Sequence, residues 1–277
     1  MSKSLDILEN LAVCEFDAGA VFSGSVSGKL VKGFAGANAF VPGVDDNYIF
    51  HEHSRDLVVW FLDSSDPLYV FGPCGCGKTS CIKQLAARLN YPVFEITGHS
   101  RLEFPEMVGH LSLCGGNMEF EYGPLALAIK YGGLFLLNEI DLLEPSTAAG
   151  LNGILDGQPL CIAENGGEIV VPHPMFRFAA TANSNGGSDE TGLYQGTLRQ
   201  NIAMMDRFVL CEVTYPKPEA EEQLLEKTAP QLPAPLRKKM VEYTTGSIEI
   251  RSIISSDGPC GVHCRENGFS GNRDSYF

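Results

Sequence analysis

One octapeptide constrains the fold more than any other part of the chain. It matches the pattern G-x-x-x-x-G-K-[ST] and consists of Gly72, Pro73, Cys74, Gly75, Cys76, Gly77, Lys78 and Thr79, followed by Ser80. The apolar run Leu68–Phe71 precedes it and predicts a buried strand, while Thr79–Leu89 predicts a helix. In this setting the glycines let backbone N–H groups wrap around phosphate at a positively polarised helix N-terminus. We therefore predict that residues 72–80 bind a nucleotide.

Lys78 and Thr79 predict how the phosphates are held. The ammonium group of Lys78 adds a point charge toward the β and γ phosphates, and the hydroxyl of Thr79 is a ligand suited to Mg²⁺. The cofactors expected from this pair are ATP and Mg²⁺. The alternative, a glycine-rich turn with a chance lysine, is disfavoured by the strand and helix on either side.

Strands and helices alternate along most of the chain. A helix is predicted at Arg55–Leu62, and beyond the octapeptide the patterns predict strands at Val93–Ile96, Leu134–Leu137 and Phe176–Thr181 and helices at Leu125–Tyr131 and Ser146–Leu155. This alternation predicts an α/β fold in which a parallel sheet lies between helices. Two apolar runs flank an Asn-Gly turn within Pro159–Pro172, which predicts an inserted β-hairpin.

Changes in composition divide the chain into three parts. Residues 1–45 are predicted to be an accessory N-terminal segment with short strands, and residues 46–214 the nucleotide-binding core. Beyond Pro216-Lys217-Pro218, helices are predicted at Glu219–Lys227 and Ala234–Tyr243. Glycines interrupt every pattern after Thr244, so residues 215–277 are predicted to form a small, incomplete helical lid with an irregular tail.

Polar residues follow the apolar strand Leu134–Leu137 directly. In open α/β sheets the carboxyl ends of the strands hold the ligand, so Asn138 and Glu139 are predicted to face the nucleotide. Glu139 is the candidate base that polarises the attacking water. Asn138 is predicted to contact the metal with Thr79, although an acidic residue is usual there and Asp141 could replace only part of the charge. The alternative is a buried strand followed by an ordinary helix cap.

Two further candidates come later in the chain. Asn183 follows the strand Phe176–Thr181 and could sense the γ-phosphate or position the water, but an asparagine after a strand can also simply form a turn. Arg207 precedes the apolar run Val209–Val213 and could reach a neighbouring subunit's nucleotide. The alternative for Arg207 is a surface ion pair.

Charge and cysteine content restrict partners and location. With 20 Lys+Arg against 34 Asp+Glu, the net charge of -14 disfavours a general nucleic-acid surface. Nine scattered cysteines are typical of reduced thiols in the cytoplasm, and those at the helix N-terminus, Cys74, Cys76 and Cys81, are predicted to have a low pKa and to be easily oxidised. No apolar run is long enough for a membrane span, and the N-terminus resembles no signal or transit peptide.

Taken together, these motifs resemble those of the AAA+ ATPases, most of all the MoxR-type, dynein-related branch that includes the ATPase subunit of aerobic cobaltochelatase. The likeness runs from Asp46–Phe50 to about Val213, and its most specific later parts are Thr191–Thr197 and Met205–Phe208. It implies nucleotide contacts from Gly72–Thr79, water activation by Glu139, sensing by Asn183 and a trans-acting Arg207. It also implies a hexameric ring, a hairpin at Pro159–Pro172 before the sensor strand, and a von Willebrand A-domain partner.

The resemblance has two departures. Asn138 stands where the family has an acidic residue. Arg251 is the candidate for the family's second sensor arginine, but a Ser/Gly-rich stretch follows it, and the end of the chain is expected to be truncated or replaced relative to the family lid. We therefore predict an ATP-hydrolysing AAA+ motor that remodels a partner protein or complex. The alternatives are the motor subunit of a cobalt chelatase and a nucleotide-binding switch with little hydrolysis.

Overall fold

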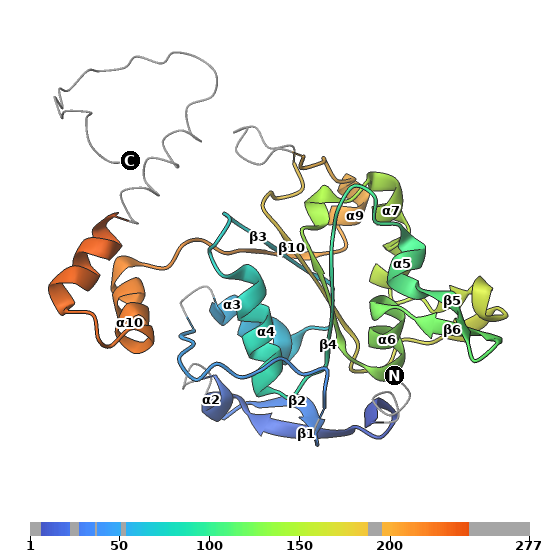
Figure 1. Ribbon diagram of the computed structural model, residues 1–277, viewed down its shortest axis with the longest axis horizontal. Coiled ribbons are helices and arrows are strands. Elements are labelled where there is room, and N and C mark those ends of the chain that lie inside the picture. The colour runs from blue at the N-terminus through green and yellow to red at the C-terminus, as the bar shows by residue number, and fades with distance from the viewer. Residues whose placement is uncertain (1–6, 23–27, 37, 51–53, 188–195, 244–277) are drawn as a thin grey trace, which may run out of the picture.

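A five-stranded parallel sheet separates two layers of helices in the computed structural model, which describes residues 7–22, 28–36, 38–50, 54–187 and 196–243 (Figure 1). The strands are β3 (Leu68–Phe71), β4 (Val93–Thr97), β7 (Leu134–Asn138), β10 (Arg177–Ala182) and β11 (Val209–Glu212). Their order across the sheet is β11-β3-β10-β7-β4, and all neighbours run parallel. Each crossover between parallel strands needs a long connection, which the helices provide. The predicted α/β fold is confirmed.

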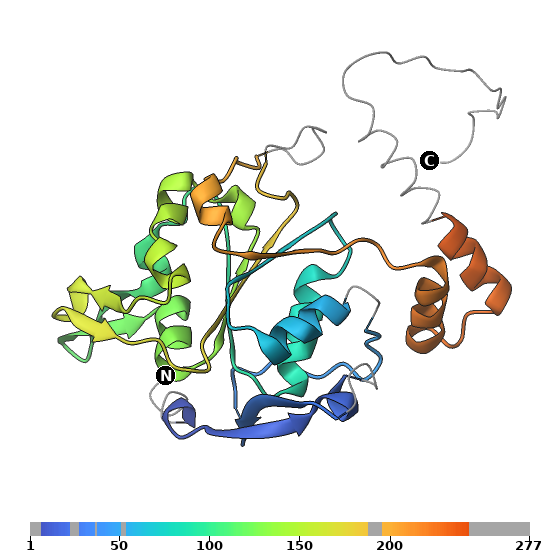
Figure 2. The same ribbon diagram turned by 180° about the vertical axis from the view of Figure 1, so that it is seen from behind.

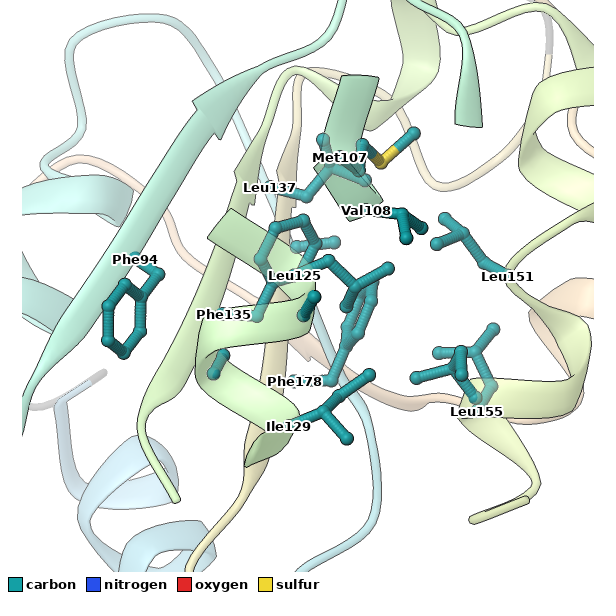
Figure 3. Packing of buried hydrophobic residues seen from close by; sticks show 14 of the residues in the cluster. Phe94, Met107, Val108, Leu125, Ile129, Phe135, Leu137, Leu151, Leu155 and Phe178 are labelled. Atoms are coloured by element: carbon teal, nitrogen blue, oxygen red, sulfur yellow. The ribbon is translucent and has the colours of Figure 1, made fainter. Parts of the chain in front are cut away.

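Strand β7 shows why the sheet is covered on both faces. All five of its residues are buried, and successive side chains point to opposite faces of a strand. Leu134 and Leu136 enter one hydrophobic cluster, whereas Phe135 and Leu137 enter the other. Figure 3 shows the second cluster, in which Phe135 packs beside Phe178 of the neighbouring strand. A continuous apolar run is therefore what a strand in this position requires.

Each helical layer covers one of these clusters (Figures 1 and 2). Helices α3 (Ser54–Asp63) and α4 (Lys78–Arg88) cover one face. The other face carries α5 (Phe104–Val108), α6 (Pro124–Tyr131), α7 (Pro145–Ala149) and α8 (Asn152–Leu155). The single helix predicted at Ser146–Leu155 is wrong, because the backbone tightens to i→i+3 hydrogen bonds at Gly150 and Leu151 and divides it into α7 and α8.

Two antiparallel hairpins project from the second helical layer. The predicted one is confirmed as β8 (Leu160–Ile162) and β9 (Glu168–Val170), joined by the short helix η2 (Ala163–Asn165). The other, β5 (Gly109–Cys114) and β6 (Asn117–Tyr122), was not predicted. Its signal was the pair Gly115-Gly116, whose φ angles of 59° and 92° provide the left-handed turn of a two-residue hairpin.

Tyr122, Lys130 and Glu168 connect the two hairpins to α6. Lys130 donates to the Tyr122 hydroxyl at 2.9 Å and to Glu168 at 3.1 Å, and Tyr122 donates to Glu168 at 2.5 Å. Burial alone would favour the neutral forms, but these hydrogen bonds prevail: they raise the pKa of Lys130 and lower that of Glu168. The hairpins are thereby oriented relative to the core.

The N-terminal residues lie across the lower end of the first helical layer (Figures 1 and 2). Strands β1 (Ala12–Asp17) and β2 (Leu30–Ala35) pair antiparallel, with α2 (Ala18–Val21) between them. The N–H of Phe34 donates to the carbonyl of Leu89 at 3.1 Å, and a side chain at Gly33 would overlap that same carbonyl. This segment therefore packs against the end of α4, and the boundary at residue 45 stays a prediction.

The remaining elements follow the sheet strands. They are η1 (Ile140–Leu142), α9 (Ile202–Met205) and α10 (Pro218–Thr228), followed by helical residues 234–243. The two helices predicted after Pro218 are present, and α10 buries none of its residues. Residues 244–277, which include Arg251, and residues 191–195 of the Thr191–Thr197 motif lie outside the described residues.

Phe135→Ala should lower the free energy of unfolding by about 3–5 kcal/mol, because its buried ring lies 5.2 Å from that of Phe178 and its loss leaves a cavity. Urea denaturation followed by circular dichroism measures the change. Leu113→Ala is the control, since Leu113 is 72% exposed, and this variant should unfold like the wild type. Equal stability of the two variants would contradict the packing described for β7.

Candidate functional site

A cleft of about 410 Å³ opens at the carboxyl edge of the sheet. Register pairs Ala182 with Phe71 and Asn138 with Thr97, so the ends of four neighbouring strands lie level there. The cleft is lined by Cys74, Gly75, Gly77, Lys78, Thr79, Ser80, Thr97, Asn138, Glu139, Thr181, Ala182 and Asn183. Segments far apart in sequence thus meet in one place, as the strand-end rule predicts.

The glycine-rich loop enters this cleft between β3 and α4. Gly75 and Gly77 have φ angles of 82° and 89°, in the left-handed region that favours glycine. A side chain at Gly72 would overlap the carbonyl of Val213, so only glycine fits beneath the loop. Helix α4 begins at Lys78 with Gly77 as its N-cap, which contributes no side-chain acceptor. The helix N-terminus therefore faces the cleft with the polarity that anions prefer.

Lys78 connects the loop to the end of β10. Its ammonium group donates to the carbonyls of Gly72 at 2.8 Å and Pro73 at 2.9 Å, and to the Asn183 side-chain oxygen at 3.2 Å. These contacts match the three N–H donors of an ammonium group, so binding of a phosphate here exchanges one or more of them. Asn183 lies beside the loop where the sequence places it, and its sensing role stays a prediction.

Thr79 and Asn138 form the centre of a polar network. The Thr79 hydroxyl donates to Asn138 Oδ1 at 2.8 Å, and the Thr181 hydroxyl donates to the same oxygen at 3.1 Å. Asn138 Nδ2 donates to Glu95 Oε1 at 2.7 Å, and Lys83 pairs with the other Glu95 oxygen at 2.7 Å. Sequence reasoning missed Glu95 and Lys83, because Glu95 reaches Asn138 only through the pairing of β4 with β7, and Lys83 joins them only through its ion pair with Glu95.

Glu139 is exposed at the rim of the cleft. Its φ of 54° is unusual for a residue other than glycine, and its N–H donates to the Thr181 hydroxyl at 3.3 Å. Any side chain at Gly98 would overlap the Glu139 carbonyl, so this glycine lets the end of β4 pass closely. The backbone thus turns sharply after Asn138, and Glu139 directs its carboxyl toward solvent in the cleft.

Asp141 does not compensate for the missing charge at Asn138, contrary to expectation. It is fully buried, and its Oδ2 accepts from the N–H groups of Asn183 at 2.9 Å and Ser184 at 3.2 Å. Tyr69 donates to the Ser184 carbonyl at 3.0 Å, and burial, with the Asp141 carboxylate nearby, raises the pKa of Tyr69. Asp141 therefore positions the segment that carries Asn183.

Arg207 lies outside the cleft of its own chain. It forms a two-point ion pair with Asp156, with Nε and Nη2 at 2.8 and 3.1 Å from the two carboxylate oxygens. These hydrogen bonds raise the pKa of Arg207. Within its own chain, Arg207 thus forms the ion pair that the sequence analysis gave as the alternative. Its role at the nucleotide of a neighbouring subunit stays a prediction.

The low pKa predicted for the thiols at the helix N-terminus is wrong for Cys76 and for Cys81. Burial raises the pKa of Cys76, whose thiol donates to the Val213 carbonyl at 3.3 Å, and burial likewise raises that of Cys81. Although the loop lies at a helix N-terminus, burial is the larger effect. Neither thiol has the exposed, electropositive setting of a reactive cysteine.

Maleimide labelling at about pH 7.5 should therefore modify Cys76 and Cys81 more slowly than the exposed Cys74 and Cys161, because a raised pKa and burial both lower the thiolate available. Peptide mass spectrometry over time measures each site, and labelling in urea should remove the difference. Fast modification of Cys76 in the native protein would contradict this assignment.

The donor set at Thr79 and Asn138 fits Mg²⁺ better than a transition metal. Both oxygens are hard, neutral ligands, and Mg²⁺ commonly combines a few protein oxygens with water and phosphate. Among the described residues no group of three or more His, Cys, Asp or Glu side chains could hold a metal by itself. The protein oxygens here therefore suit a metal that arrives with phosphate.

A glycine-rich loop between strand and helix, at the carboxyl edge of a parallel sheet, defines a P-loop nucleotide-binding protein. Residues 67–199 match the AAA domain of the dynein-related subfamily. Residues 67–199 are therefore an AAA domain of the dynein-related subfamily, and the predicted resemblance to the MoxR-like, dynein-related branch of the AAA+ ATPases is confirmed.

Curated relatives agree with this assignment. The chain is 30% identical over 182 residues to aerobic cobaltochelatase subunit CobS of Sinorhizobium sp, covering 64% of this chain and 55% of CobS. It is 29% identical to the denitrification regulatory protein NirQ of Stutzerimonas stutzeri, covering 64% and 61%, and 28% identical to NorQ of Paracoccus denitrificans, covering 57% and 56%. The chain thus spans little more than half the length of these relatives.

Proposed function

We propose that this protein is a Mg²⁺-dependent, ATP-hydrolysing AAA+ motor that remodels a partner protein or complex. The observation that carries the proposal is the cleft itself, which is lined by Lys78 and Thr79 from the start of α4 and by Glu139 directly after the end of β7. Phosphoryl transfer needs positioning and charge placement more than covalent help, and these residue types provide both.

Each residue has a distinct task in this proposal. The loop N–H groups and Lys78 hold the phosphates, and Glu139 takes a proton from the attacking water as it adds to the γ-phosphorus and ADP leaves. Asn183, already held at Lys78 by a 3.2 Å hydrogen bond, reports the γ-phosphate through that lysine. Thr79 and Asn138 would hold Mg²⁺, which neutralises charge on the phosphate oxygens.

Assembly would complete the site. We propose a homo-hexamer in which Arg207 reaches the neighbouring subunit's nucleotide, and this requires the Arg207–Asp156 pair to exchange for phosphate. The location of Arg207 outside the cleft of its own chain is consistent with contact to the nucleotide of a neighbouring subunit. A von Willebrand A-domain protein is the partner that the resemblance implies, and nucleic acid is disfavoured by the acidic charge.

A cytoplasmic location is part of the same proposal. Among the described residues, cysteines 14, 76, 81, 161 and 211 are free thiols, which reducing compartments maintain. Within the described residues, none of the helices has the length and apolar character needed to cross a bilayer.

Two narrower functions remain as candidates. The likeness to CobS favours the motor subunit of a cobalt chelatase, although the differently named NirQ and NorQ match to a similar degree. Asn138 favours a nucleotide switch with little hydrolysis, because a carboxamide brings no negative charge to the metal.

The deciding experiment is phosphate release from ATP by the purified protein, with and without Mg²⁺, accompanied by size-exclusion chromatography with and without nucleotide. Mg²⁺-dependent release supports the motor. Tight ATP binding without release supports the switch, and absence of ATP binding would overturn both. Candidate von Willebrand A-domain proteins can then be tested for stimulation of the measured rate.

A further inference from the structure

Glu95 lies on β4, the strand next to β7, and β7 carries Asn138 at the position where an acidic residue is expected. Register pairs Glu95 with Leu136 and Thr97 with Asn138 across β4 and β7, so Glu95 and Asn138 lie on the same face of the sheet. On α4, Thr79 and Lys83 are four residues apart and share one face of the helix. This arrangement gives a continuous chain of contacts, Thr79–Asn138–Glu95–Lys83.

The carboxylate of Glu95 determines how the Asn138 carboxamide is oriented. An ionised carboxylate only accepts hydrogen bonds, so Asn138 must present its Nδ2 to Glu95, which it does at 2.7 Å. The opposite orientation would place two acceptor oxygens against each other. Asn138 Oδ1 is consequently directed at Thr79, at 2.8 Å, where it can face a metal.

Glu95 also brings a formal negative charge to the site. Asn138 is 8% exposed and neutral, whereas the Glu95 side chain is 34% exposed and lies within hydrogen-bond distance of it. Lys83, on the outer side, offsets part of that charge through its 2.7 Å ion pair with Glu95. A charge-assisted hydrogen bond to Glu95 makes the amide oxygen a better electron donor.

We propose that Glu95 is a positioning residue for Mg²⁺: it orients Asn138 toward Thr79 and supplies, through that amide, the negative charge that an acid at residue 138 would provide. The inference rests on the proposed function, since it concerns the metal that accompanies ATP. The competing explanation is an ordinary surface ion pair between Lys83 and Glu95, which would matter only for stability.

Opposite effects of two substitutions separate these explanations. Glu95→Gln removes the charge and should raise the Mg²⁺ concentration for half-maximal binding of a fluorescent ATP analogue about tenfold. Lys83→Gln leaves the Glu95 charge unneutralised and should lower that concentration. A purely structural ion pair predicts that both variants shift Mg²⁺ dependence in the same direction, or not at all. Glu119→Gln, on the exposed strand β6, is the matched control and should behave like the wild type.

A second variant tests the position of the charge. Asn138→Asp next to Glu95 places two carboxylates together, so it should lower the melting temperature of the nucleotide-free protein. In the Glu95→Gln background the same substitution should be tolerated and should restore the Mg²⁺ dependence of the wild type. This thermal readout requires neither nucleotide nor turnover, so it also detects a misfolded variant.

The outcomes distinguish this inference from the function on which it rests. A wild-type protein that binds no ATP would overturn the proposed function, and the metal role of Glu95 with it. A protein that binds ATP but whose Mg²⁺ dependence shifts in one direction in both variants, or not at all, would overturn the inference alone. Loss of thermal stability by Asn138→Asp regardless of residue 95 would also count against it.

Discussion

Lys78→Ala should weaken ATP binding at least about 100-fold, equivalent to about 3 kcal/mol, and should reduce phosphate release to background. The substitution removes the ammonium group that contacts Gly72, Pro73 and Asn183 in the structure and that would face the phosphates. Because it is half-buried at a helix N-terminus, this charge is less screened than one on the surface. Titration of a fluorescent ATP analogue measures the affinity, and a coupled phosphate assay measures turnover.

Lys227→Ala is the matched control for this prediction, since Lys227 carries the same charge on the exposed surface of α10. It should bind and hydrolyse ATP like the wild type. The Lys78→Ala protein should also retain its circular dichroism spectrum, because Lys78 is not one of the residues that form the two hydrophobic clusters. Wild-type affinity in Lys78→Ala would place the nucleotide elsewhere and contradict the proposed site.

The elements that the sequence predicted well depend on local patterns. Continuous apolar runs at residues 68–71 and 134–137 predicted the strands β3 and β7, and the loop between 72 and 79 has its own glycine spacing. The rule that strand ends form the site needs no knowledge of strand order. It therefore correctly placed Asn138, Glu139 and Asn183 beside the loop from their positions after apolar runs alone.

The contacts that the sequence did not predict depend on the order of strands. Glu95 reaches Asn138 only because β4 is the neighbour of β7, and no local pattern specifies that pairing. The prediction that Asp141 would replace part of the charge at Asn138 failed for a related reason. The chain turns at Glu139 and enters η1, so the Asp141 carboxylate accepts from the N–H of Asn183 after β10 and does not face Thr79. Asp156, the partner of Arg207, is 51 residues away in sequence, so local sequence patterns could not predict this ion pair either.

Asn138 illustrates how a departure from a family pattern can be understood once neighbours are known. Taken alone, an amide in place of an acid indicates weak metal binding and favours a switch. In the structure the Asn138 oxygen accepts hydrogen bonds from two threonine hydroxyls, and its nitrogen donates one to a carboxylate. Both polar atoms of the side chain therefore have a partner. Whether the protein acts as a switch or as a motor therefore depends on how well Glu95 replaces the negative charge that Asn138 lacks.

Glu139→Gln should separate binding from turnover, with an effect on phosphate release of about 100-fold or more. Glutamine has the same shape and occupies the same exposed position at the rim of the cleft, but its amide cannot take a proton from water. ATP affinity should therefore match the wild type while hydrolysis is lost. This is the opposite division from Lys78→Ala, in which the loss of turnover follows from the loss of binding.

The control for Glu139→Gln is Glu144→Gln, because Glu144 is also exposed and lies only five residues further along the chain. It should leave phosphate release unchanged. If Glu139→Gln hydrolyses ATP at the wild-type rate, another group activates the water, and the role assigned to Glu139 is wrong. If instead the wild type binds ATP without releasing phosphate, neither Lys78→Ala nor Glu139→Gln will change turnover. Lys78→Ala will still weaken ATP binding, whereas Glu139→Gln will not. In that case the nucleotide switch becomes the better description of this protein.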